Sequence, residues 1–173
     1  MQNKIVLLVL LYFPYLSFAQ IGMPGSVERM QISELGLKTS SSNEAVFLDH
    51  PRAHILTKLG TPNSIEDYYY EMDELMAERF IYNTNYVFVS NDKLDAFELT
   101  DNSLSVSYRG KSIKVGDHYN EVSEMYVYAD NYKGPNFYAI KLFHEEVEQD
   151  GKMLIVHFNS STNLITKILL HEL

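Results

Sequence analysis

The pattern of hydrophobic and polar positions predicts a helix over residues 49–59, followed by a run of strands. Ile55, Leu56 and Leu59 share one helical face, and Asp49 and Pro51 suit the first turn. Gly60-Thr61-Pro62 then prevents the helix from continuing. Alternating or β-branched and aromatic runs, separated by turn-forming residues, predict an antiparallel meander with strands at residues 65–72, 79–82, 85–90 and 94–99.

A similar order of elements returns in the second half. After a short strand at residues 112–115, Asp117 is predicted to cap a helix whose apolar face holds Tyr119, Val122, Met125 and Tyr126. Asp150-Gly151 is the strongest hairpin signal in the chain. The remaining strands are predicted at residues 137–148, 152–158 and 164–170. The sequence therefore predicts an α+β fold of two tandem helix-plus-antiparallel-meander repeats.

The N-terminal residues predict an exported protein. Lys4 precedes the apolar run Ile5–Leu16, which is too short to span a bilayer, and Ser17-Phe18-Ala19 fits a signal-peptidase site. We expect a signal peptide at residues 1–19, an N-terminal arm at 20–48 with an edge strand near Met30–Leu35, and repeat units at 49–108 and 109–173. No later apolar run reaches 18 residues, so we expect no transmembrane segment in the mature chain and a periplasmic or extracellular location.

Charge and composition narrow the function. The chain has 14 Lys and Arg against 23 Asp and Glu, a net charge of −9, which argues against sequence-independent nucleic-acid binding. It has no Cys, so disulfides, thiolate metal sites and a Cys nucleophile are excluded. The hydrophobic and charged fractions, 46% and 21%, are typical of a globular protein rather than a disordered one.

Two short segments resemble a known family. Ile113-Lys114-Val115-Gly116-Asp117 with Tyr126, and Ile55 to Pro62, are similar to the start and end of the helix in the small outer-membrane lipoprotein of the barrel-assembly machinery. The tandem arrangement is similar to that of β-lactamase inhibitory proteins. The resemblance covers residues 49–173 and implies a repeated architecture with a binding surface. The chain lacks the lipidated Cys of the first group and the disulfides of the second, and we carry over no functional residue.

Histidine and acidic residues give no complete catalytic set. His50 and His54 have a helical spacing that suits a metal, with Asp49 as a third ligand, but Pro51 occupies the place of a general base. His144-Glu145 lies in a predicted strand, where neighbouring side chains point to opposite sides. The sequence thus favours a protein that is not an enzyme and has no metal or other cofactor. A small secreted hydrolase using His and carboxylate residues remains an alternative, as does a structural envelope component.

Tyrosine is the unusual residue type, with 13 in the chain. Strand alternation assigns Tyr68 and Tyr70 to the core and leaves Tyr69 exposed between two acids. Tyr128 and Tyr132 lie near a predicted loop. Because tyrosine provides rigid contact area with a polar tip, we predict Tyr69, Tyr128 and Tyr132 as partner-binding residues. The predicted function is an exported, non-catalytic protein that docks a protein or cell-envelope partner through an aromatic-rich sheet face.

Overall fold

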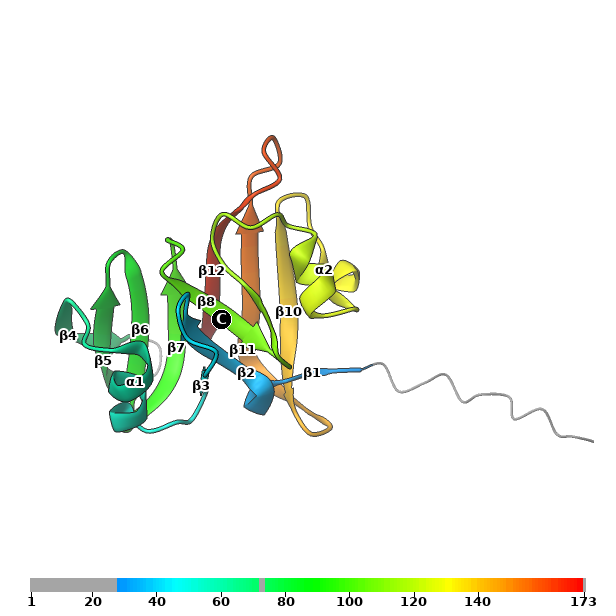
Figure 1. The fold of residues 1–173 in the computed structure, drawn as a ribbon. Coiled ribbons are helices and arrows are strands. Elements are labelled where there is room, and N and C mark those ends of the chain that lie inside the picture. The colour runs from blue at the N-terminus through cyan, green and yellow to red at the C-terminus, as the bar shows by residue number, and fades with distance from the viewer. Residues whose placement is uncertain (1–27, 72–73, 173) are drawn as a thin grey trace, which may run out of the picture.

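Two β-sheets form the protein in the computed structural model, which describes residues 28–71 and 74–172 (Figure 1). The large sheet has the strand order β1-β10-β11-β12-β7-β6-β5-β4. Its strands are β1 Met30–Gln31, β4 Ser64–Tyr70, β5 Leu75–Tyr82, β6 Asn85–Ser90, β7 Lys93–Leu99, β10 Phe137–His144, β11 Val147–Phe158 and β12 Ile165–Glu172. The small sheet has the order β3-β2-β8-β9, with β2 Leu35–Thr39, β3 Val46–Phe47, β8 Leu104–Tyr108 and β9 Lys111–Ile113.

The large sheet joins two meanders along β7 and β12. These strands pair in antiparallel orientation, with Leu169 opposite Glu98 and Leu170 opposite Phe97. Only β1 is parallel to its neighbour, β10. The predicted meander of the first half is confirmed as β4 to β7, and the Asn83-Thr84 turn connects β5 with β6 as expected.

One face of the large sheet is covered. Helix α1 (Arg52–Leu59), the small sheet and helix α2 (Glu121–Met125) all lie on that face (Figure 1). Two short 3-10 helices, η1 (Ile32–Glu34) and η2 (Ala129–Tyr132), contact β10. Buried side chains from both halves of the large sheet, from the small sheet and from both helices form one hydrophobic cluster, which is the core of the protein.

The predicted fold class is wrong. Strands account for 53% of the described residues and helices for only 14%, so the protein is mostly β and not an α+β repeat of helix-plus-meander units. The overlooked part is the small sheet. Leu35 and Leu37 alternate in β2, and Leu104, Val106 and Tyr108 alternate in β8, but the prediction treated the first segment as an arm and assigned no strand to the second.

The second helix is much shorter than its apolar pattern predicted. Asp117 does not begin it; Asn120 is the N-cap residue, and α2 ends before Tyr126, whose φ and ψ of −136° and 108° are extended. Val127 and Tyr128 follow, and β-branched and aromatic residues are poor helix formers. The helical spacing from Tyr119 to Tyr126 therefore arises from a short helix flanked by turns.

The predicted hairpin at Asp150-Gly151 is also wrong. The β10–β11 turn lies at Glu145-Glu146, because His144 pairs with Val147 and Phe143 with Glu148. Residues 150 and 151 lie within β11, opposite an interruption in the register where residue 142 faces residues 149–152. Gly151 has a φ of +78°, so the left-handed backbone signalled by the sequence forms a bulge instead of a turn.

The structure tests only part of the predictions for the N-terminal segment, because its description begins at residue 28. The predicted signal peptide at residues 1–19 lies outside the described residues. Within residues 20–48 the structure places β1, η1, β2 and β3, so this segment is built into both sheets. Neither helix in residues 28–71 and 74–172 has the length and apolar composition needed to cross a bilayer. The predicted unit boundaries, 49–108 and 109–173, stay predictions.

Candidate functional site

The face of the large sheet opposite the helices is the candidate site. In the described part of the chain, Figure 1 shows no helix or second sheet over it. We call this surface the open face. Its half-buried apolar and aromatic side chains include Tyr68, Tyr70, Ile81, Tyr86, Phe88, Phe137, Ala139, Met153, Ile155 and Leu169. The register places Ala139, Ile155, Leu169, Glu98, Tyr86 and Ile81 in one row across six strands.

Strand alternation explains why these residues line a single face. In β6, Val87 and Val89 are almost completely buried toward the core, whereas Tyr86 and Phe88 point the other way and are half-buried. Sheets with one solvent-exposed face usually carry polar residues there. Here the second face also carries many apolar and aromatic side chains.

Aromatic rings form a cluster at the β4–β6 end of the open face. The ring centroid of Tyr68 lies 5.1 Å from that of Tyr70 and 5.0 Å from that of Phe88. The Arg79 guanidinium lies over the rings of Tyr68 and Tyr86, at 5.5 and 5.0 Å from their centroids. Its Nη2 atom also donates a hydrogen bond to Glu66, and this contact raises the pKa of Arg79. Cation–π contacts and the ion pair together fix the positions of the rings.

Aliphatic side chains dominate the β10–β12 end, where Ile155 lies between Ala139 and Leu169 in the register. An ion pair between Lys167 Nζ and Glu98 Oε1, 2.7 Å apart, lies between the aliphatic and aromatic ends. Lys141 Nζ pairs with Glu148 Oε1 at 2.8 Å. His157 lies opposite Phe137, and burial, with a smaller effect of Lys167, lowers the pKa of His157.

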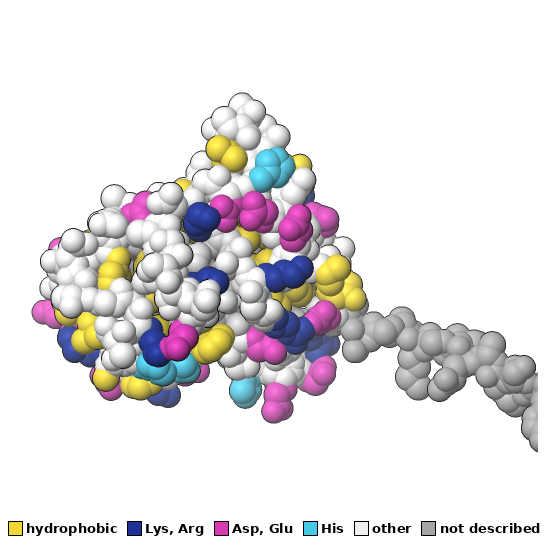
Figure 2. Space-filling view, in the orientation of Figure 1, with side chains coloured by type: hydrophobic (Ala, Val, Ile, Leu, Met, Phe, Trp, Pro, Cys, Tyr) yellow, Lys and Arg dark blue, Asp and Glu magenta, His cyan; other side chains and the backbone are white. Residues whose placement is uncertain are grey.

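The charges of the open face therefore largely neutralise one another. Three cations of the open face, Arg79, Lys141 and Lys167, each have a carboxylate partner. Acidic and basic side chains also alternate on the side that carries the helices and the small sheet (Figure 2). The open face thus has no basic patch that would attract a polyanion.

The three predicted partner-binding tyrosines do not lie together. Tyr69 is 50% exposed, as predicted, and belongs to β4 at one end of the large sheet. Tyr128 and Tyr132 are half-buried against the core, beside α2 and β10 at the other end. All three lie outside the open face, so the structure does not bring them into one surface.

The sequence pattern does not predict the residues that do share a surface. Tyr68 and Tyr70 were assigned to the core, but they are half-buried on the open face. For Tyr86 and Phe88 the sequence predicts only that they lie in a strand. The available signal was that β6 is apolar at consecutive positions, which is the pattern of a strand with two apolar faces.

The histidine pair does not form a metal site or a catalytic pair in the described structure. The His50 and His54 rings stack, with centroids 4.7 Å apart and planes 6° from parallel, and His50 also contacts the edge of Phe47. Burial, followed by the charge of His54, lowers the pKa of His50. No group of three or more potential ligands gathers within residues 28–71 and 74–172. The hydrolase alternative therefore gains no support from this pair.

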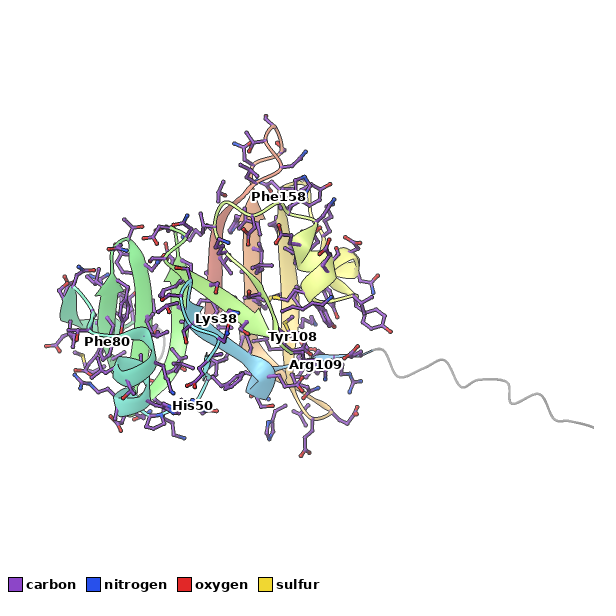
Figure 3. All side chains as sticks on the ribbon, in the orientation of Figure 1. Lys38, His50, Phe80, Tyr108, Arg109 and Phe158 are labelled. Atoms are coloured by element: carbon purple, nitrogen blue, oxygen red, sulfur yellow. The ribbon has the colours of Figure 1, made fainter. Side chains whose placement is uncertain are left out.

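Two small clefts lie at the small sheet, near Lys38 and near Arg109, which are separated from each other (Figure 3). The first is polar and includes Lys38, Lys114 and the hydroxyl groups of Ser105 and Ser112. The second is lined by Tyr108 and Tyr126 among others. Burial raises the pKa of both phenols to about 12, so they remain neutral.

No protein-family model, curated protein or solved structure matches the chain. The resemblance to the barrel-assembly lipoprotein and the β-lactamase inhibitory proteins stays a prediction. The candidate site rests on its geometry alone.

Proposed function

We propose that the protein is an exported, non-catalytic binding protein that docks a partner protein through its open face. The observation that supports this most strongly is an apolar sheet face, rich in aromatic rings, that no described element covers. Uncovered apolar surface of this kind marks interaction sites. Its aromatic residues, Met153 and Arg79 are residue types enriched in protein interfaces.

The charge distribution favours a protein as the partner. Nucleic acids and anionic membranes attract unpaired Lys and Arg, whereas Arg79, Lys141 and Lys167 are paired with acids and the chain has a net charge of −9. A partner with an apolar centre and a polar rim matches the open face better. The rings are already held by Arg79, so docking orders few side chains.

Site-specific photocrosslinking in the producing cells tests the proposal. A photoreactive phenylalanine analogue replaces Phe88 at the aromatic end or Ile155 at the aliphatic end, and we expect both to give an adduct with the same protein. The control position is Val127, which is 67% exposed beside α2 on the other side. We expect no such adduct from it. Adducts from Val127 alone, or adducts with nucleic acid or lipid, contradict the proposal.

A variant tests whether one partner spans the whole open face. Ile155→Lys places an unpaired charge at the aliphatic end, and we expect it to abolish the crosslink from position 88. Val127→Lys makes the same chemical change elsewhere and should leave that crosslink intact. Thermal unfolding of both variants establishes that they fold. Loss of the crosslink in both folded variants, or in neither, argues against docking through this face.

A further inference from the structure

Strand β4 is an unusual edge. It contains seven residues and ends the large sheet, so one side of its backbone has no neighbouring strand in the described part of the chain. The other three edge strands, β1, β3 and β9, have only two or three residues. Proteins commonly shorten edge strands to prevent pairing with other chains. With seven residues, β4 is not shortened in this way.

Apolar side chains flank this edge on both faces of the sheet. On the α1 side, Ile65, Tyr69 and Met76 are 42%, 50% and 57% exposed, and Tyr69 lies directly opposite Met76. These are three of the six exposed large hydrophobic residues in the described structure. On the open face, Tyr68 and Tyr70 form part of the aromatic cluster. A strand added to β4 would find apolar neighbours for its side chains on both faces.

The charges at the edge determine which strand would fit. Asp67, Glu71 and Glu74 are exposed, and within the described residues none of them pairs with a cation. A second copy pairing antiparallel around Asp67 would place two carboxylates directly opposite each other, which is destabilising. An extended segment carrying Lys or Arg would instead be attracted to these carboxylates.

We propose that β4 is a β-augmentation site that binds an extended, basic segment of another protein as a ninth strand of the large sheet. Backbone hydrogen bonds along β4 provide the affinity, and the flanking apolar and acidic side chains provide the selectivity. This site goes beyond docking through the open face, because it uses the backbone edge of β4, although Tyr68 and Tyr70 border both surfaces. Either interaction can therefore exist without the other.

The test uses a seven-residue peptide of alternating lysine and valine, acetylated and amidated at its ends, added to the mature protein. We expect saturable binding with slowed amide hydrogen exchange in residues 64–70. The matched probe carries a methyl group on every backbone nitrogen, which keeps charge and side chains but removes all backbone donors. We expect it to bind roughly tenfold more weakly or not at all. Equal binding of both peptides, or protection elsewhere, overturns the proposal.

A charge-reversal variant tests the selectivity. Asp67→Lys with Glu71→Lys should lose the lysine peptide and bind the corresponding glutamate–valine peptide instead. Glu124→Lys with Glu145→Lys changes the net charge equally at exposed positions away from the edge and should keep the original preference. If both double variants lose the lysine peptide equally, only overall charge matters and the site is refuted. Ile155→Lys should leave peptide binding unchanged, which separates this result from the fate of the open face.

Discussion

The side chain of Asn85 makes four hydrogen bonds with the loop that follows β7. It is completely buried at the start of β6. Its Oδ1 accepts from the backbone N–H groups of Thr100 and Asp101, and its Nδ2 donates to Asp101 Oδ1 and Ser103 Oγ, all within 2.8–3.0 Å. The side chain thereby fixes the passage of the chain from the large sheet to β8 in the small sheet.

We expect Asn85→Ala to lower the free energy of unfolding by roughly 2–4 kcal/mol, because it leaves two backbone donors without an acceptor. Asn102→Ala is the matched control, since Asn102 is exposed in the same loop and should shift this free energy by less than about 0.5 kcal/mol. Urea unfolding measures both values. Similar losses in the two variants would show that the Asn85 hydrogen bonds have no special role.

His50 should make stability depend on pH. Burial first, and His54 second, place its pKa in the folded protein below the unfolded value of about 6.5. The folded state therefore binds fewer protons, and the free energy of unfolding falls as the pH decreases through about 6.5 until the folded pKa is passed. His157, with a pKa lowered mainly by burial, adds to the same trend.

The measurement is thermal unfolding between pH 5 and pH 8. We expect His50→Gln to flatten the profile and His50→Gln with His157→Gln to flatten it further. His144→Gln, which removes an exposed histidine at the end of β10, should preserve the slope. An unchanged slope in the double variant would mean that other groups control the pH dependence.

At the scale of elements, the sequence predicted a feature correctly where the residues of a single element determine it. Helix α1 ends at Leu59 before Gly60, whose φ is +86°, as the Gly and Pro predicted. Its start differs because Asp49 adopts a φ of +67° and Pro51 becomes the N-cap residue. Gly151 was recognised as a left-handed position, but its use in a bulge depends on the register of β10, which a local pattern does not encode.

Gly36 in β2 illustrates a constraint that sequence patterns do not express. A Cβ atom at this position would lie 2.6 Å from the backbone oxygen of Val46 in β3, so β3 would have to move. We expect Gly36→Ala to reduce the free energy of unfolding by about 1–3 kcal/mol. Ser107→Ala, at its cross-strand partner in β8, is the control and should have a smaller effect in chemical denaturation. If Gly36→Ala is neutral, β3 is free to shift.

For the whole molecule, the sequence predicted most strands of the large sheet but not the fold class. In the small sheet, β8 and β9 form a local hairpin, but β8 also pairs with β2, which joins residues near 35 and 105 that no local pattern connects. The open face was missed for a similar reason. The role of Tyr68 and Phe88 depends on which face the helices and small sheet cover, and that is decided by packing between distant segments.

Because all described parts of the chain share one core, we expect the protein to fold as one unit. Buried residues from the predicted arm, from residues 49–108 and from residues 109–173 belong to one hydrophobic cluster, and β8 at the end of the middle segment lies between β2 and β9 from the other two. Separating residues 49–108 from 109–173 would expose the β7 and β12 edges and the apolar face beneath the small sheet. We therefore expect the mature chain to unfold in one cooperative transition by circular dichroism and calorimetry, and each segment alone to show none. A cooperative thermal transition in the isolated 109–173 segment would show instead that the two units are independent domains.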